Sequence, residues 1–475
     1  MKQRLSDIGL IGLGPMGQAL AQNMEHQGLH VSVYNRTHSV TKTFLKEHEG
    51  DFFGFEQMSA FVRSLKRPRK IMLMIKDGKP VDMTINGLLA HLDKGDIIID
   101  GGNSFYRDTE RRADMLKKRG LLYIGTGVSG GEDGALNGPS LMPGGSKKAY
   151  ASTKKIFEAI AAKDFKGNPC VTYIGDGGAG HYVKMVHNGI EYGIMQLIAE
   201  AYHTLHTVFD MSAPEIGEVF HRFNKGKLES FLMEIAVPVL EKGCKPGEDE
   251  YLIYHILDKA SNKGTGKWAS IDALDRGVAV PTITEAVFAR FISTKKEERT
   301  QLEKIYKTKY KKSTIAKTRF VRTLEDALFA AMLSVFAQGY DLIQTASREE
   351  KWDIDMGEVS RIWEGGCIIR AKMLNMLHIA YASHKKNDTH VFVVPTVAAI
   401  MKKHAPAFRS LVSFTADAGI PNPAFASSLS YFESMISAQL PANVIQGLRD
   451  YFGAHTYERI DKPGTFHTDW EHTAE

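Results

Sequence analysis

The sequence predicts an α/β fold with a doubly wound parallel sheet, followed by a large all-α domain and a C-terminal tail. Three observations support this prediction. Short apolar runs alternate with amphipathic stretches near the N-terminus, a glycine-rich turn follows the first run, and long helical patterns fill most of the remaining chain. Strands separated by helices form parallel sheets with helices on both faces. The 475 residues also exceed what one core organises.

The runs expected to form strands are short and bounded by turn residues. They are residues 7–12, 30–35, 70–75, 96–100, 121–126 and 171–175. After a glycine-rich stretch the strand pattern stops and helical patterns follow. We therefore expect a nucleotide-binding type of domain at 1–178, an all-helical domain at 179–435 and a tail at 436–475. Within the helical part, residues 215–226 resemble residues 355–366, which predicts two related helical units.

Composition narrows the class of protein. The net charge of +5 suits small anionic ligands but is too weak for a dedicated nucleic-acid binder. Cys170, Cys244 and Cys367 lie far apart, so neither a disulfide framework nor a metal site is indicated, and a reducing, cytoplasmic location is expected. The sequence has no apolar run of about 18 residues and no room for a signal peptide, so we expect no membrane partner.

GLGPMG, at residues 12–17, follows the first expected strand and opens a helix. In this context Gly12 allows a tight turn, Gly14 lets the backbone approach a pyrophosphate, and Gly17 lets the helix pack on the strand. The pattern predicts a Rossmann-type dinucleotide site.

The cofactor preference is expected to depend on the end of the second strand, which carries Asn35, Arg36 and Thr37. A carboxylate at this position would repel a 2′-phosphate, whereas a guanidinium and a hydroxyl favour it. The sequence therefore predicts NADP rather than NAD as the cofactor. Two later loops, with Asn103 and with Ser129, Gly130 and Gly131, are expected at the same edge of the sheet.

A polar stripe marks the helix that starts near residue 180. Lys184, His187, Asn188 and Glu191 are spaced so that they share one helical face. The following turns are apolar nearly all round, so the helix is buried and the stripe is expected to face a cleft rather than solvent. A lysine among these residues disfavours a metal site and favours general acid and base chemistry.

The chain resembles the decarboxylating 6-phosphogluconate dehydrogenase family nearly from end to end. The matching motifs are GLGPMG, YNRT, IIIDGGNS, GVSGGEDGA, GPSLMPGG, AGHYVKMVHNGIEYG, KGTGKW, EAVFAR, GGCIIR and RDYFGAHTYE. The resemblance implies oxidation of 6-phosphogluconate at C3 by NADP, loss of carbon dioxide and release of ribulose 5-phosphate, a step of the pentose phosphate pathway. It implies Lys184 as the base and acid at C3 and Glu191 as the acid at C1. Lys184 must then be neutral, which burial favours.

The resemblance also implies ligand contacts by residue. For the substrate they are Asn103, Ser129, Gly130, Gly131, His187, Asn188, Tyr192, Lys263, Arg290, Arg449 and His455. For NADP they are Gly12, Leu13, Gly14, Pro15, Met16, Gly17, Asn35, Arg36, Thr37, Ile75, Lys76, Asp77 and Asn103. In this family the tail with Arg449 and His455 reaches the neighbouring subunit and completes its phosphate site, which implies a homodimer.

Three alternatives stay open at this point. A non-decarboxylating relative would oxidise a smaller 3-hydroxy acid with the same lysine, in a shorter chain without RDYFGAH. A cofactor-sensing binding protein would not need Lys184 and Glu191. Nucleic-acid binding would depend on the cations of residues 304–319, which more simply form a solvated helix and linker.

Overall fold

The computed structural model describes residues 4–245, 250–261, 264–307, 309–383 and 389–471. Lys263, one of the residues expected to bind substrate, lies outside these ranges. The chain separates into two compact units, one up to Ser428 and one from Leu429 onward. None of the described helices has the length and apolar character needed to cross a membrane.

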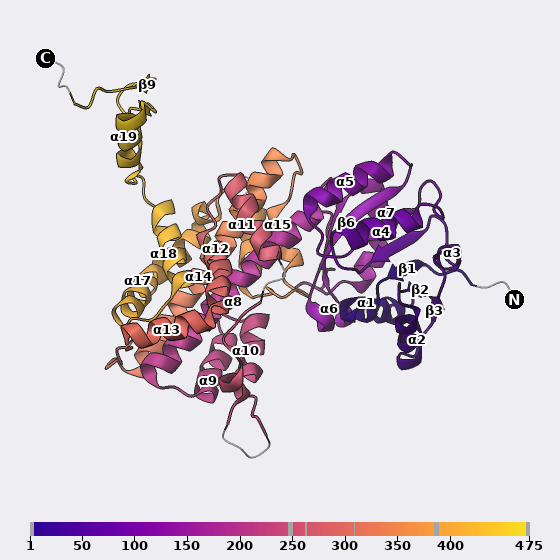
Figure 1. Cartoon of the computed structure of the whole chain (residues 1–475), viewed down its shortest axis with the longest axis horizontal. Helices are drawn as coiled ribbons and strands as arrows, with labels where there is room; N and C mark the ends of the chain where they lie inside the picture. Colours follow the sequence, from indigo (N-terminus) through magenta and orange to yellow (C-terminus); the bar gives the residue numbers. More distant parts are fainter. Residues whose placement is uncertain (1–3, 246–249, 262–263, 308, 384–388, 472–475) are drawn as a thin grey trace. The chain divides into compact units, whose positions relative to one another are not determined.

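The first unit begins with a seven-stranded sheet in the order β3-β2-β1-β4-β5-β6-β7 (Figure 1). The strands are β1 (Ile8–Ile11), β2 (Val31–Tyr34), β3 (Phe52–Phe55), β4 (Lys70–Leu73), β5 (Ile97–Asp100), β6 (Leu122–Ser129) and β7 (Ser140–Gly145). Neighbouring strands pair in parallel from β3 to β6, and β7 pairs antiparallel with β6. This arrangement confirms the predicted Rossmann-type sheet.

The sheet differs from the prediction at one expected strand. Residues 171–175 form only an isolated bridge, between Leu141 and Val171, so their assignment as a strand was wrong. The segment instead runs beside β7, where Ile174 N donates to Pro143 O at 2.9 Å. β7 itself was not predicted, because its sequence SLMPGG has the proline and glycines of a turn, and β3, with the sequence FFGF, was not among the expected strands either. Proline is tolerated there because β7 is an edge strand.

Helices cover the sheet, and both of its faces are buried. These helices are α1 (Pro15–His26), α2 (His38–Glu47), α3 (Met58–Arg63), α4 (Lys79–Leu88), α5 (Tyr106–Lys117), α6 (Gly131–Asn137) and α7 (Lys147–Ile160). Along β5, Ile97 and Ile99 belong to one hydrophobic cluster and Ile98 to another. Because consecutive side chains of a strand point to opposite faces, this division explains the unbroken apolar run.

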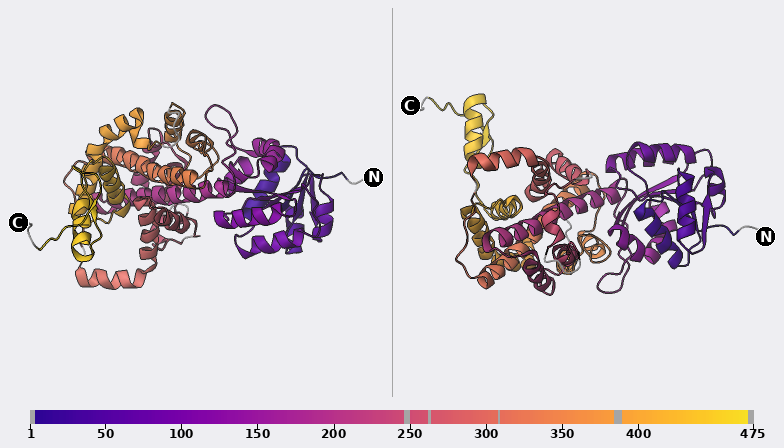
Figure 2. Two further views of the ribbon diagram at one scale, coloured as in Figure 1. Left: turned by 90° about the horizontal axis from the view of Figure 1, so that it is seen from above. Right: turned by 60° about the horizontal axis from the view of Figure 1, so that its bottom comes forward.

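The rest of the first unit is helical. It contains α8 (Ala179–Phe209), α9 (Ala213–Asn224), α10 (Phe231–Glu241), η1 (Leu252–His255), α11 (Thr265–Asp275), α12 (Pro281–Thr294), α13 (Lys296–Tyr306), α14 (Lys317–Glu349), α15 (Met356–Ile362), α16 (Met373–Ser383), η2 (Val391–Val393) and α17 (Pro395–Asp417), and α18 (Pro423–Met435) continues past its end. The long helices α8 and α14 pack side by side (Figure 2). The first turns of α8 contact β6 and β7, so α8 joins the sheet to the helical part.

A long helix followed by a short capped one occurs twice. α9 follows α8 and is capped by a capping box between Ser212 and Glu215. α15 follows α14 and is capped by Asp355, whose carboxylate accepts from Gly357 N and Glu358 N. This order agrees with the similarity between the two stretches of sequence. The relation of the two helical units stays a prediction.

The second unit contains α19 (Ala442–Gly453), β8 (Tyr457–Glu458) and β9 (Thr465–Phe466). Its side chains converge on Asp450, whose carboxylate accepts hydrogen bonds from Thr456 N at 2.8 Å, Trp470 Nε1 at 2.9 Å and Thr468 N at 3.0 Å. A buried carboxylate with several donors is a polar centre rather than an apolar core.

Candidate active site

The turn between β1 and α1 uses its three glycines differently. Gly12 has a φ of +102°, and a Cβ there would lie 2.4 Å from Met74 O. A Cβ at Gly17 would lie 1.9 Å from Gly12 O, whereas a Cβ at Gly14 would meet no described atom within 4 Å. The fold therefore requires the first and third glycines and leaves open space at the second. This space suits a ligand that approaches the backbone closely.

The N-terminus of α1 has the properties of an anion site. Among the described residues, no side chain caps this helix, and its first turn has no acidic residue. Backbone N–H groups at such an end carry a partial positive charge. The open space at Gly14 and the uncapped helix together fit the pyrophosphate of a dinucleotide.

The loops after β2 and β4 adjoin this turn. Asn35 Oδ1 accepts from Leu13 N at 3.1 Å, and Asn35 Nδ2 donates to Thr37 O at 3.2 Å. Arg36 and Thr37 are exposed at the start of α2. The Ile75 side chain comes within 2.5 Å of where a Gly12 Cβ would lie. The three segments expected to hold NADP therefore lie at one edge of the sheet.

A cavity of about 510 Å³ opens beside this edge. Its lining includes eleven of the residues expected to bind ligands or to act in catalysis: Pro15, Met16, Asn103, Ser129, Gly130, Gly131, Lys184, Asn188, Glu191, Tyr192 and Arg290. The glycine-rich turn and the polar stripe of α8 thus face one space.

Lys184 is buried at the wall of this cavity, with 6% of its surface exposed. Its Nζ donates to Asn188 Oδ1 at 2.8 Å and lies 3.4 Å from His187 Nδ1. Burial lowers the pKa of Lys184 from its ordinary value, and the charges of Glu191 and Cys367 oppose this shift. Desolvation disfavours the charged form, which favours the neutral amine, and only the neutral amine can accept a proton.

His187 connects the stripe to the loop after β6. Its Nε2 lies 3.1 Å from Ser129 Oγ, and its Nδ1 lies 3.2 Å from Asn188 Oδ1. The amide oxygen can only accept, so Nδ1 carries the proton and Nε2 accepts from the serine hydroxyl. Burial and, second, the charge of Lys184 lower the pKa of His187 well below its ordinary value. The His187 ring is therefore neutral, and it contacts both Lys184 and the amide of Asn188 that binds the lysine.

Tyr192 and Arg290 line the same cavity as Glu191 and contact each other. Arg290 Cζ lies 3.3 Å from the centroid of the Tyr192 ring, and Arg290 Nη1 donates to Ser261 O at 3.3 Å. Stacking of a guanidinium on an aromatic face fixes the orientation of the guanidinium. Glu191 lies one turn beyond His187, and 22% of its side chain is exposed. The cavity therefore has a carboxylate and a cation close to Lys184.

Two of the residues expected to bind substrate lie outside the first unit. Arg449 and His455 belong to the second unit, and both are exposed there. Arg449 donates to Gln446 Oε1 at 3.1 Å, and the His455 ring lies against Phe452. Their expected role in a substrate site remains a prediction.

Other lining residues were not predicted from the sequence. They are Val128, Glu132, Met195, Ser261, Thr265 and Ile368. Val128, Glu132, Thr265 and Ile368 lie inside motifs that were recognised, so these motifs could have indicated them. Ile368 also contacts the loop after β6, where its backbone N donates to Ser129 Oγ at 3.4 Å, across 239 positions. No local pattern signals such a contact.

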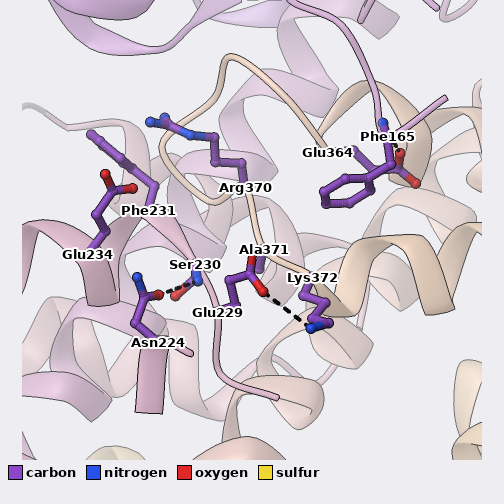
Figure 3. Close-up of a pocket in the computed structure, with 10 residues that line it drawn as sticks. All are labelled: Phe165, Asn224, Glu229, Ser230, Phe231, Glu234, Glu364, Arg370, Ala371 and Lys372. Carbon is purple, nitrogen blue, oxygen red and sulfur yellow. Dashed lines mark hydrogen bonds and ion pairs between the residues drawn. The ribbon is translucent and has the colours of Figure 1, made fainter. Parts of the chain in front are cut away.

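A second cavity of about 270 Å³ is lined in part by residues 370–372, which follow Ile368 closely in the chain (Figure 3). It is lined by Phe165, Asn224, Glu229, Ser230, Phe231, Glu234, Glu364, Arg370, Ala371 and Lys372. Figure 3 shows Arg370 beside Phe231, and the guanidinium carbon lies 3.7 Å from the ring centroid. None of the residues expected to bind ligands lines this cavity.

The sheet, the glycine-rich turn and the buried lysine define a Rossmann-type dehydrogenase with an added helical domain. Two family models match the chain: the NAD binding domain of 6-phosphogluconate dehydrogenase over residues 7–175, and the 6-phosphogluconate dehydrogenase C-terminal domain over residues 180–470. The chain belongs to the 6-phosphogluconate dehydrogenase family.

Similar proteins cover almost the whole chain. It is 50% identical to the NADP-dependent, decarboxylating 6-phosphogluconate dehydrogenase of Bacillus subtilis, over 98% of both chains. It is 47% identical to decarboxylating 6-phosphogluconate dehydrogenase 1 of Spinacia oleracea, over 98% of this chain and 97% of the other. The solved 6-phosphogluconate dehydrogenase of Plasmodium falciparum matches with a TM-score of 0.94 and 42% identity, over 98% of this chain and 100% of that one.

Proposed function

We propose that this protein oxidises 6-phosphogluconate with NADP and decarboxylates the product to ribulose 5-phosphate and carbon dioxide. One observation carries the proposal: a single cavity is lined both by the glycine-rich turn and by buried Lys184 with Glu191. The relatives' names supply the substrate and the cofactor, since they describe NADP-dependent, decarboxylating enzymes. The non-decarboxylating alternative is disfavoured, because similarity to decarboxylating enzymes extends over nearly the whole chain.

Lys184 acts first as a base. As a neutral amine it takes the proton of the C3 hydroxyl group, which turns C3 into a carbonyl carbon as its hydride departs. The nicotinamide of bound NADP would supply the acceptor for this hydride. Asn188 Oδ1, 2.8 Å from Nζ, holds the amine in place. The lowered pKa of Lys184, caused chiefly by burial, supports this role, because a base must be unprotonated to act.

The same lysine then acts as an acid. The ammonium formed in the first step returns its proton to the C3 carbonyl oxygen while the bond between C1 and C2 breaks. The electrons of that bond move toward C3, so carbon dioxide leaves and an enediol remains. Glu191, in its protonated form, then delivers a proton to the carbon that was C2 of the substrate and becomes C1 of ribulose 5-phosphate. Lys184 takes the proton of the hydroxyl group on the neighbouring carbon, which becomes the carbonyl carbon of the product. The β-keto acid provides its own electron sink, so this scheme uses no metal.

The other expected residues hold the two ligands. Ser129, His187 and Asn188 form a hydrogen-bonded group with Lys184 and would orient the sugar acid. Arg290, kept beside Tyr192, is suited to the substrate's phosphate, together with Lys263. In our proposal, Arg449 and His455 of a second copy complete that phosphate site, so the working form is a homodimer.

The cofactor is proposed to lie along the edge of the sheet. Its pyrophosphate would bind at α1, its 2′-phosphate would meet Arg36 and Thr37, and the loop of Ile75, Lys76 and Asp77 would flank it. Asn103 would serve both ligands. We further propose the division of the chain into residues 1–178 for NADP, 179–435 for the helical domain and 436–475 for the tail, and a cytoplasmic location.

The proposal is tested by mixing the purified protein with 6-phosphogluconate and either NADP or NAD. We expect NADPH and carbon dioxide in equal amounts, and slower turnover with NAD. NADPH without carbon dioxide would favour the non-decarboxylating alternative, and the absence of both products would favour a binding protein.

A further inference from the structure

Arg112, on α5, holds the end of the loop after β4. Its side chain is fully buried. Its Nε donates to Asp82 Oδ1 at 2.8 Å, and its Nη2 donates to Gly78 O at 3.1 Å. Gly78 immediately precedes α4, and Asp82 lies in the first turn of that helix. One side of the guanidinium therefore fixes the segment that directly follows Lys76 and Asp77.

The other side of the same guanidinium holds the loop after β5. Arg112 Nη1 donates to Ser104 Oγ at 3.4 Å and lies 3.6 Å from Asp100 Oδ2. The Asp100 carboxylate in turn accepts from Gly102 N at 3.1 Å and from Ser104 Oγ at 2.7 Å. The loop is thus folded around a buried carboxylate that faces Arg112, and it presents Asn103 to the cavity.

A histidine extends this connection to α8. His181 Nε2 lies 3.1 Å from Asp100 O, and His181 Nδ1 lies 2.6 Å from Thr109 Oγ1. A carbonyl oxygen only accepts, so Nε2 carries the proton and Nδ1 accepts from the threonine hydroxyl. Burial lowers the pKa of His181, which keeps the ring neutral as this pattern requires. His181 lies one helical turn before Lys184, so Arg112 connects through Asp100 to the helix that carries the proposed base.

We propose that Arg112 is a positioning residue that couples the binding of NADP to the binding of 6-phosphogluconate. The inference rests on the proposed function, which assigns the loop after β4 to the cofactor and Asn103 to both ligands. A guanidinium is a planar group with donors in fixed directions, so a shift of one loop moves the partners of the other. Each ligand, by ordering the loop that it touches, then favours the loop position that the second ligand requires.

The alternative is a purely structural ion pair. Removing one partner of a buried pair destabilises a protein in any case, because the other charge is left without a partner. Loss of stability therefore does not separate the two explanations. A change in the dependence of one ligand's affinity on the other does separate them.

The test measures the dissociation constant of NADPH by its fluorescence, with and without saturating 6-phosphogluconate. This pair cannot react, because the nucleotide is already reduced. We expect the wild type to bind NADPH at least about fivefold more tightly when the sugar acid is present. In Arg112→Lys, which keeps the charge but loses the planar group, we expect the ratio of the two constants to fall to within about twofold of one.

Arg111→Lys is the matched control. Arg111 is exposed and binds the same Asp82 at 3.0 Å, so this change tests that carboxylate without altering the buried guanidinium. We expect the wild-type ratio in this variant. If Arg112→Lys does not fold, Ser104→Ala serves instead. It removes the contacts of Ser104 with Nη1 and with the Asp100 carboxylate but keeps the charge pair of Arg112 and Asp100, and we expect a ratio below that of the wild type.

An unchanged ratio in Arg112→Lys, or in Ser104→Ala where Arg112→Lys does not fold, would overturn the proposal, even if the melting temperature fell. A wild type that turns over but shows a ratio of one would overturn it as well. Failure of the proposed function has a different signature, since the wild type would then not form NADPH and carbon dioxide in equal amounts.

Discussion

At the scale of single residues, the stripe on α8 combines groups whose charges depend on burial. Lys184 and His187 are both buried, and the pKa of each is lowered, for both chiefly by burial. His187 is thereby a neutral hydrogen-bond partner, and Lys184 becomes easier to deprotonate than a lysine in water. Of these two residues, only the lysine is therefore expected to change its protonation state during the reaction.

This difference predicts the pH dependence of kcat/KM. Lys184 must be neutral to act as the base, so activity rises with pH as its ammonium loses a proton. Because burial lowers the pKa of Lys184, the midpoint of this rise is expected below the ordinary value of 10.5. Initial rates at low substrate concentration over a range of pH measure it. A midpoint at or above the ordinary lysine value would contradict the role of burial.

Arg36 is expected to set the preference for NADP. In Arg36→Asp a carboxylate would face the 2′-phosphate, and like charges brought together cost several kcal/mol, so kcat/KM with NADP should fall by about a hundredfold. The value with NAD should change much less. Arg63→Asp, an equal change of charge at the end of α3, is the control. If the ratio of kcat/KM with NADP to kcat/KM with NAD is unchanged in Arg36→Asp, Arg36 does not set the preference.

The sequence predicted the stripe but not its partners. The spacing of Lys184, His187 and Asn188 was sufficient to place them on one helical face. The bond between His187 and Ser129 joins residues 58 positions apart and depends on how α8 packs against β6. Arg112 gave no signal at all, because a buried arginine has the same sequence signature as a solvated one on an amphipathic helix.

At the scale of elements, the turn between β1 and α1 separates structural glycines from one that serves a ligand. We expect Gly14→Val to fold normally, since a Cβ there would meet no described atom within 4 Å. The added side chain would instead fill the space proposed for the pyrophosphate. The KM for NADP should rise by about tenfold or more, the equivalent of about 1.4 kcal/mol.

Gly226→Ala is the control for the turn, because its Cβ would make only ordinary contacts, 3.5 Å from Phe223 O. This variant should keep the wild-type KM for NADP. A Gly14→Val protein with an unchanged KM would show that the dinucleotide does not approach this turn. Thermal melting of both variants checks that the fold is preserved.

The strands of the sheet also show which sequence patterns predict a strand reliably. Unbroken apolar runs such as residues 96–100 identified the central strands, because both faces of the sheet are buried. β7 was missed because its glycines pack against other backbone: a Cβ at Gly144 would lie 2.3 Å from Gly180 N. Residues that look like a loop therefore form an edge strand where α8 approaches the sheet closely.

At the scale of the whole molecule, the tail is the part whose proposed function depends on a second copy. The chain ended after Leu448 would lack Arg449, His455 and the polar centre at Asp450. We expect this truncated protein to lose turnover and to dissociate more readily in analytical ultracentrifugation. The full-length double variant Arg449→Ala and His455→Ala should keep its dimers while the KM for 6-phosphogluconate rises. An active truncated monomer would refute the shared site.

The central claim is that Lys184 performs the proton transfers in the cavity shared by the turn and the stripe. Its most direct test compares the wild type with Lys184→Met, which has no titrating group, for production of NADPH and carbon dioxide. We expect both products to form in equal amounts with the wild type and to fall together by about 10²- to 10⁴-fold in the variant, with NADPH binding unchanged. A Lys184→Met protein that keeps wild-type turnover would contradict the account.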